Sequence, residues 1–592
     1  MRLAKKHGYF LILLLLGLIT RVVFLSYHGL SNDELSAWYR TGFSSWDDFW
    51  YFGVTHGDMH PVFYQALLWC WVRLFGDADW IIRVPSIFFY MGNMFLIYGI
   101  CRKYFSEKAA YLPLLMYIGS SFLIIHTTLA RPYNSGSFFI LFSFLAILEL
   151  NEKKDRSWKW IFFLSLGLSG AMLSHYFAFL TAGVLGLLGL IVLNSKKRWD
   201  VVIAGALACV YFLPHLSVTW HQLNRGGLQW LAAPSWNWLM DVGVQLLNNS
   251  VWLALLFLSV IVYSLINKRI KSSHPIAFRM AWLIVLLTLV FGYLISYLLT
   301  PVLRELVVLF ILPFLLIVLG HQIQLSKTVT ILGAFVLLLH SFMFDSVLKF
   351  HHFGDFKFLA ADINKIHHKT GFSSITHATN TNNAAYLNYY LKNDVKEDIK
   401  NWDEPEAVNK LFARVQRIKT PYFLYALNNA YHSEQFIAVI RSRYPVVLKD
   451  ASFGNSRYVF FKNSDKQLKP KMVQQTRVSE EEFLATFTWP VSKFNSESSV
   501  FLTNHSIIDG NEPVYGVVTI ERDGKQLLNG NSPVLYQSFD ANQQFKGNKD
   551  LGTAYLGFRL PSACLPSDSI KCYLWNPAQL KVRPGKWTIG YR

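Results

Sequence analysis

Two short groups of acidic and histidine residues lie close together in a polar stretch, residues 28–79. The first, Ser-Asn-Asp-Glu-Leu, contains the adjacent residues Asp33 and Glu34. The second, Thr-His-Gly-Asp-Met-His-Pro, contains Asp58 and His60. A carboxylate within hydrogen-bond reach of a hydroxyl or amine can act as a general base. Without further support, the stretch could equally be a solvated loop with aromatic anchors at a membrane interface.

A second set of polar residues recurs where apolar segments begin or end. Ionisable groups at membrane depth are costly and usually functional, and arginine pairs well with phosphate. These residues therefore favour an anionic, lipid-linked substrate. The aromatic and histidine residues of this set could instead be packing residues in an aromatic belt at the membrane–water interface. The set consists of Arg83, Arg131, Tyr133, His175, Tyr176 and Arg304.

Composition indicates which elements position these groups. The 592 residues are 53% hydrophobic and 16% charged, whereas soluble domains contain about 25% charged residues. These figures exclude a wholly soluble protein and a disordered chain. Apolar windows long enough to cross a bilayer predict a polytopic α-helical membrane domain over 1–345. We expect eleven spans, near 9–27, 80–101, 109–128, 132–150, 159–177, 178–194, 200–217, 248–267, 278–299, 303–320 and 328–345.

The net charge of +19 fits this topology. With a cytoplasmic N-terminus, eighteen lysine and arginine residues fall in the cytoplasmic segments and five in the opposite loops, as the positive-inside rule requires. The basic surplus therefore gives no reason to expect a nucleic-acid partner. An odd number of spans places the tail outside the cytoplasm.

The tail is predicted to hold two exported domains. Mixed helices and strands indicate a small α/β domain over 346–463, followed by a linker over 464–482. Short strands with turn signals predict a β-sandwich over 483–592. Cys564 and Cys572 could form a disulfide there, with two free thiols as the alternative. The sandwich could bind an acceptor glycan, although Trp489, Trp575 and Trp587 are expected in its core.

Four motifs, in order and in their spacing relative to the spans, carry a family resemblance. They are NDEL in the first loop, HP before a helix, RVPSI and ARPYN. The chain resembles bacterial relatives of the protein O-mannosyltransferases in the C-type (GT-C) glycosyltransferase superfamily, which also holds the lipid A aminoarabinose transferase. The resemblance is closest over 1–180 and continues to 345.

The resemblance implies a polyprenyl-phosphate sugar donor, transfer on the exported face and Asp33 as catalytic base, with Glu34 beside it. It also implies that Asp58 and His60 line the site and that Arg131 lies near the donor phosphate. Val62 departs from the family, where a second proline often follows HP. Arg304-Glu305 stands where an Arg-Tyr pair is common.

We predict an inverting glycosyltransferase of the bacterial inner membrane that acts on a lipid, glycan or protein acceptor. One alternative is a ligase or polymerase using a diphosphate-linked glycan, and another is a transporter or flippase. No cofactor is required by the sequence. A divalent metal stays open because His56, Asp58 and His60 are ligand types, although two imidazoles in a loop are a weak signal.

Overall fold

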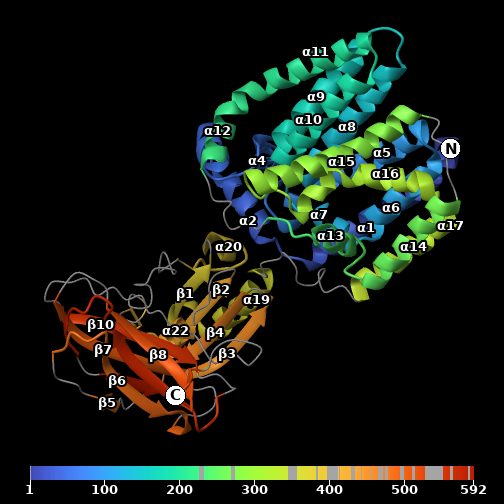
Figure 1. Cartoon of the computed structure of the whole chain (residues 1–592). Coiled ribbons are helices and arrows are strands. Elements are labelled where there is room, and N and C mark those ends of the chain that lie inside the picture. Colours follow the sequence, from blue (N-terminus) through green and yellow to red (C-terminus); the bar gives the residue numbers. More distant parts are fainter. Residues whose placement is uncertain are drawn as a thin grey trace. The chain divides into compact units, whose positions relative to one another are not determined.

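The computed structural model describes residues 2–225, 233–267, 274–343 and most of 356–591; short gaps, 396–410 and 527–550 fall outside the described residues. The chain divides into two compact units, Met1–Phe353 and Gly354–Arg592 (Figure 1). The boundary lies close to the one expected between the membrane domain and the tail.

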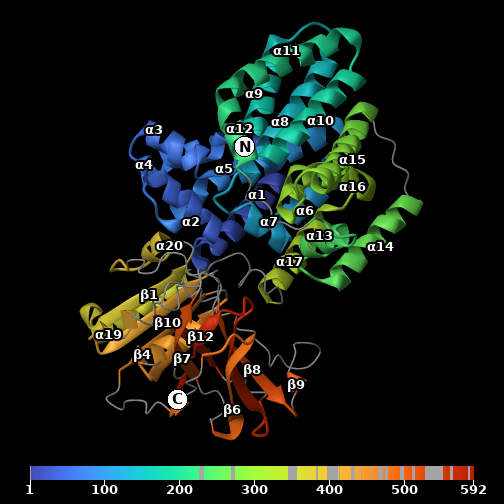
Figure 2. The same ribbon diagram turned by 60° about the vertical axis from the view of Figure 1, so that its left-hand side comes forward.

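The first unit is helical. Its first part contains α1 (Arg2–Tyr27), α2 (Asn32–Tyr39), η1 (Arg40–Gly42), α3 (Trp46–Asp48), η2 (Phe49–Thr55), α4 (Val62–Phe75), α5 (Asp79–Tyr104), η3 (Glu107–Ala110), α6 (Tyr111–Gly119), α7 (Ser121–His126) and α8 (Tyr133–Glu152). It continues with α9 (Trp158–Ser174), α10 (Tyr176–Val192), α11 (Ser195–Phe212), η4 (Leu213–His215), α12 (Leu216–Asn224), α13 (Trp238–Leu246), α14 (Val251–Asn267), α15 (Pro275–Leu298), η5 (Glu305–Phe310), α16 (Leu312–Ile323) and α17 (Lys327–Met343). Helices α8, α9 and α10 pack side by side (Figures 1 and 2).

Every expected span coincides with a helix or a helix pair, but their lengths differ. In the described part of the chain, five helices are long and apolar enough to cross a membrane, or six if the bent pair α13 and α14 is one span. Four shorter apolar helices, α4, α10, α16 and α17, have 10–17 residues. The structure supports a multi-pass membrane protein, whereas the count of eleven spans stays a prediction.

The segment expected as one span over 109–128 is broken at Ser120, between α6 and α7. Asn248, which has a left-handed φ of 61°, fills this break from the 96° bend between α13 and α14. Its Oδ1 accepts from the Ser121 amide at 2.7 Å, and its Nδ2 donates to the carbonyls of Gly119 and Leu337 at 3.3 and 2.8 Å. Buried backbone groups freed by the break therefore regain partners.

Arg21 stabilises helix α7, the segment that follows this break. The side chain is fully buried in α1 and donates to Thr127 Oγ1 at 2.9 Å and to the Tyr117 carbonyl at 2.5 Å. Its guanidinium also lies 4.0 Å from the centre of the Tyr90 ring, an additional cation–π contact. These contacts hold the end of α7 and hence the turn that leads into α8.

The second unit begins with mixed helices and strands: α19 (Phe356–Thr370), η6 (Phe372–Ser374), β1 (Ile375–Thr381), α20 (Ala384–Asn388), β2 (Tyr422–Asn428), α22 (Glu434–Arg441), β3 (Val446–Phe453) and β4 (Ser456–Lys462). The sheet order is β1-β2-β4-β3, and β1 and β2 run parallel. Phe423, Tyr425 and Leu427 of β2 pack with Phe436 and Ile440 of α22. The expected α/β arrangement is therefore present.

The last part of the chain is built of strands: β5 (Lys471–Val473), β6 (Phe483–Pro490), η7 (Val491–Lys493), β7 (Ser499–Asp509), β8 (Tyr515–Arg522), β9 (Lys525–Gln526), β10 (Leu551–Arg559), β11 (Ser569–Trp575), β12 (Lys581–Arg583) and β13 (Trp587–Tyr591). They form one sheet ordered β10-β7-β13-β5 and another ordered β6-β11-β8-β9. Strands β8 and β9 pair antiparallel, and Asp523, which follows β8, has a φ of 51°.

The structure bears on two expectations for the tail, the linker and the cysteine pair. Part of the expected linker, Lys471–Val473, forms β5 and pairs with β13, while 464–470 and 474–477 lie outside the described residues. Of the two alternatives for Cys564 and Cys572, the structure has the free thiols and not the disulfide. Cys572 is buried in β11, and Cys564 lies half-buried before that strand. A separate β-sandwich domain stays a prediction, since α22 packs on β7 and β10.

Candidate functional site

The first loop folds into short helices that fix both acidic groups. Helix α2 begins with a capping box: Ser31 Oγ accepts from the Glu34 amide at 3.2 Å, and Glu34 Oε2 accepts from the Ser31 amide at 2.9 Å. Such a box satisfies amides that have no partner inside the helix. Asp33 and Glu34 therefore both lie in the first turn, where the helix dipole favours negative charge.

Glu34 is fully buried and lies between three parts of the chain. Its Oε1 accepts from Arg83 Nε at 2.7 Å and from the Ala130 amide at 2.9 Å, and its Oε2 accepts from Arg83 Nη2 at 2.7 Å. Arg83, on α5, also donates to the carbonyls of His28 and Gly29. The pair joins the loop, α5 and the turn before α8.

These contacts correct two expected roles. Neither Glu34 nor Arg83 is exposed, and the carboxylate oxygens already receive four hydrogen bonds. Glu34 cannot take a proton from a substrate in this arrangement, and Arg83 cannot reach a phosphate. The contacts of Glu34 are those of a carboxylate that fixes α2 in place.

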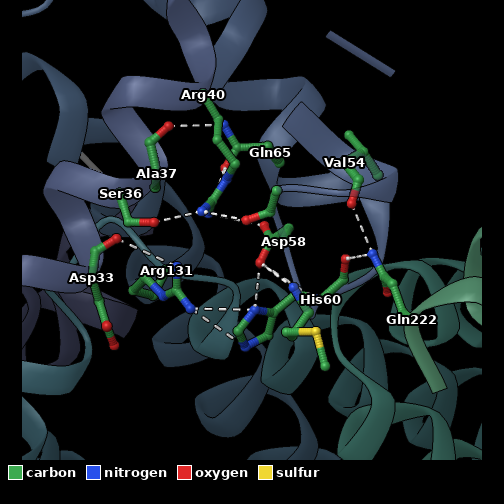
Figure 3. A network of polar contacts seen from close by, with 12 residues as sticks. Asp33, Ser36, Ala37, Arg40, Val54, Asp58, His60, Gln65, Arg131 and Gln222 are labelled. Atoms are coloured by element: carbon green, nitrogen blue, oxygen red, sulfur yellow. Dashed lines mark hydrogen bonds and ion pairs between the residues drawn. The ribbon is translucent and has the colours of Figure 1, made fainter. Parts of the chain in front are cut away.

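Asp33 differs from its neighbour because its side chain is exposed. Its backbone carbonyl accepts from Arg131 Nη1 at 3.4 Å, and its carboxylate extends away from the buried network (Figure 3). Burial lowers the pKa of the Arg131 guanidinium, but the negative charge of Asp33, together with other nearby groups, outweighs burial. The pKa of Arg131 is therefore raised. An exposed carboxylate therefore lies beside a permanent cation.

Asp58 lies at the centre of a buried polar network (Figure 3). Its Oδ2 accepts from Arg40 Nη2 at 3.0 Å, and its Oδ1 accepts from His60 Nδ1 at 2.9 Å and from the Met59 amide at 2.8 Å. Arg40 also donates to Ser36 and Gln65. Burial would raise the pKa of Asp58, but Arg40 and His60 hold it well below its usual range. Asp58 therefore stays a carboxylate and does not exchange protons near neutral pH.

His60 links this network to Arg131. Nη2 of Arg131 lies 3.2 Å from Nδ1 and 3.5 Å from Nε2 of His60. Burial and the positive charge of Arg131 lower the pKa of His60, so the ring is neutral near pH 7. With Nδ1–H donated to Asp58, the imidazole orientation is fixed. Asp58, His60 and Arg131, expected together, do meet.

Residues from three other elements complete the surroundings of His60. The His175 ring, between α9 and α10, lies 5.0 Å from the His60 ring and 5.8 Å from that of Tyr133. Tyr176 donates to Gln222 Oε1 at 2.5 Å, and Gln222 Nε2 donates to the carbonyls of Val54 and His60 at 2.9 and 3.3 Å. Tyr176 thus acts on the site through the amide of Gln222.

Arg304 is not part of this network. Its ion pair in the described structure is with the adjacent Glu305, at 3.6 Å, and its side chain is 43% exposed. Among the described residues, no hydrogen bond or ion pair joins it to Asp33, Asp58 or Arg131. Its role as a substrate contact therefore stays a prediction.

The metal hypothesis finds no support in the geometry. His56 Nδ1 bonds to the Tyr51 carbonyl at 2.9 Å, and Asp58 and His60 bind each other. Among the described residues, no group of three histidine, cysteine, aspartate or glutamate side chains is arranged to hold a metal ion.

Comparison with known proteins agrees with this architecture. Residues 59–218 match the family model of the dolichyl-phosphate-mannose-protein mannosyltransferases. The crystal structure of ArnT from Cupriavidus metallidurans bound to undecaprenyl phosphate is similar, with 12% identity and a TM-score of 0.51, and the match covers 78% of this chain and 100% of that one. The apo structure gives 12% identity and a TM-score of 0.50, covering 78% and 98%. No curated protein sequence matches the chain.

The chain is a multi-pass membrane protein whose fold is similar to that of ArnT, and its residues 59–218 resemble the protein mannosyltransferases. The matched segment begins within the first loop, at Met59, and ends in α12, so it includes His60, Arg131, His175 and Tyr176.

Proposed function

We propose that this protein transfers a sugar from a polyprenyl-phosphate donor to an acceptor on the exported face of the bacterial inner membrane. The observation that carries the proposal is the placement of Asp33. Its carboxylate is exposed beside Arg131, whereas those of Glu34 and Asp58 are buried and fully engaged. The similar ArnT structure with undecaprenyl phosphate supports a lipid phosphate as the carrier.

Asp33 acts as the general base. Its carboxylate takes the proton from an acceptor hydroxyl or amine as that atom attacks the anomeric carbon. The new bond forms as the bond from the anomeric carbon to the phosphate oxygen breaks, and the electron pair leaves on the polyprenyl phosphate. Arg131 stabilises the charge that grows on the leaving oxygen. One such displacement inverts the anomeric configuration.

The proposal also includes the orientation of the protein in the membrane. Basic residues concentrate in the loops expected in the cytoplasm, which supports a cytoplasmic N-terminus and an exported first loop. The acceptor is a lipid, a glycan or a protein side chain.

The test uses the purified full chain in lipid nanodiscs, a labelled polyprenyl-phosphate sugar and an envelope extract as acceptor. We expect wild-type protein to transfer label and Asp33→Asn to lose at least about a hundredfold in rate, as for loss of a general base. Asp47→Asn, an exposed aspartate in the same loop, is the matched control. Transfer only from a diphosphate-linked oligosaccharide would favour the ligase alternative, and full activity of Asp33→Asn would remove the assigned base.

A further inference from the structure

In the sheet ordered β6-β11-β8-β9 (Figure 2), strand β11 has one buried and one partly exposed row of side chains. Along β11, Ile570, Cys572 and Leu574 are fully buried, while the intervening residues Lys571, Tyr573 and Trp575 are partly exposed. Successive side chains of a strand point to opposite faces. Trp575, expected in a core, therefore lies on the outer face with Tyr573.

A third aromatic residue joins these two. Phe483 opens β6, is 53% exposed and is the register partner of Trp575. Its ring centre lies 5.6 Å from that of Tyr573, at an angle of 72°. We call Phe483, Tyr573 and Trp575 the aromatic platform.

Hydrogen-bonding groups border the aromatic platform. Glu482 Oε1 accepts from the Trp575 indole at 3.1 Å, which fixes the indole ring. At the other end of β11, Lys571 Nζ lies 3.3 Å from Glu521 Oε1, and the exposed Thr488 is the register partner of Lys571. Polar groups therefore flank the three rings on neighbouring strands.

We propose that the aromatic platform binds a carbohydrate chain and thereby holds the acceptor glycan of the transferase. A pyranose ring presents C–H groups on its faces and hydroxyls at its rim. Its faces suit Phe483, Tyr573 and Trp575, and its rim suits Glu482, Lys571 and Thr488. Side chains two apart on a strand lie about 7 Å from each other, so the chain can lie along β11 and touch more than one ring.

The mixture of groups favours a glycan over other occupants. A stable protein partner needs about 800 Å² on each side, more than three rings provide. A bilayer would have to desolvate the carboxylates of Glu482 and Glu521, which is costly. The choice of carbohydrate rests on the proposed function, because a glycan acceptor explains why such a surface is joined to a transferase.

Calorimetry with the full chain in detergent tests binding without any donor. The probes are cellohexaose, mannohexaose and water-soluble glycan released from the envelope of the producing cells. We expect at least one probe to bind wild-type protein, and Trp575→Ala and Phe483→Ser to weaken that affinity about tenfold or more. Phe358→Ala, an exposed aromatic on α19 of the same unit, is the matched control and should bind as wild type.

Phe483→Ser keeps the test decisive if Trp575→Ala unfolds, since the phenyl ring is half exposed. Failure of all three probes to bind wild-type protein, or unchanged affinity in a folded Phe483→Ser variant, would overturn the proposal. The measurement of glycan binding does not depend on catalytic activity. Glycan binding without sugar transfer would refute the proposed function alone, whereas transfer without glycan binding would refute the aromatic platform alone.

Discussion

Arg83 donates to both carboxylate oxygens of Glu34, at 2.7 Å each, and neither side chain reaches solvent. The two residues are separated by 49 positions in the sequence. The Ala130 amide adds a further hydrogen bond to Glu34. This buried pair fixes α2 against the turn that carries Arg131, and so sets the position of Asp33 beside that arginine.

Loss of one partner of this pair should destabilise the protein. Glu34→Gln keeps the shape but leaves the guanidinium of Arg83 buried without its counter-charge, which costs about 3–5 kcal/mol. We expect a large fall in the Tm of the detergent-solubilised protein, in contrast to a small change for Asp33→Asn. The double variant Glu34→Gln with Arg83→Met should be more stable than Glu34→Gln alone, because no unpaired charge remains. A wild-type Tm for Glu34→Gln would contradict the structural role.

Asp58 should affect the rate without being the base. Arg40 and His60 keep its pKa well below the usual range, so the carboxylate does not titrate during turnover. Asp58→Asn removes the charge that orients His60, and we expect kcat/KM to fall about tenfold or more. Asp58→Asn should still be more active than Asp33→Asn, because the proposed base is retained. Asp48→Asn, in the same loop and exposed, is the control. Activity of Asp58→Asn as low as that of Asp33→Asn would instead assign the base to Asp58.

Tyr176→Phe tests whether the Gln222 amide positions the site. The phenol hydroxyl donates to Gln222 Oε1, and the amide in turn donates to the His60 carbonyl. One hydrogen bond contributes about 0.5–1.5 kcal/mol, which corresponds to a two- to tenfold fall in kcat/KM. Tyr211→Phe removes an exposed hydroxyl on α11 and should leave the rate unchanged. Equal rates for the two variants would show that the Tyr176 hydroxyl does not contribute.

Acid should destabilise the second unit through His377. Burial, aided by the charges of His367 and Arg414, lowers the pKa of His377 to about 3. Its Nε2 lies 2.8 Å from that of His367, so one neutral ring donates to the other. An unfolded histidine binds a proton below about pH 6.5, whereas the folded His377 does not. Stability should therefore fall as the pH drops from about 6.5 towards 3.

Unfolding of the second unit, followed by tryptophan fluorescence between pH 7 and 4, measures this effect. His377→Gln should reduce the pH dependence, and His368→Gln, an exposed neighbouring histidine, should not. An unchanged pH slope in a folded His377→Gln variant would refute the assignment.

Much of the architecture could be predicted from the sequence because its signals are local. Apolar runs located α1, α5 and α15, and basic residues between the runs predicted the topology. Alternation and turn residues indicated the strands β8 and β9. The break at Ser120 was missed, because the hydropathy of 109–128 is continuous and the compensating Asn248 lies 127 residues away from Ser121.

The site was predicted in part. Asp33, Asp58, His60 and Arg131 were named from short motifs, while Arg40, Gln65 and Gln222 were missed. These three have no distinctive spacing, and each gains its role only from packing. Arg83 was assigned to substrate for its type and its place near a span end, although its partner is a carboxylate of the protein.

The sequence by itself determined the class of protein and the segments that form its helices, because hydrophobic length and charge placement are properties of continuous stretches of chain. Only the tertiary structure decided which acidic residue is free to react. Asp33 and Glu34 are neighbours, but a helix turns about 100° per residue, so their side chains face different surroundings. Arg83 and Ala130 approach one face and bury Glu34, and the other face leaves Asp33 exposed beside Arg131.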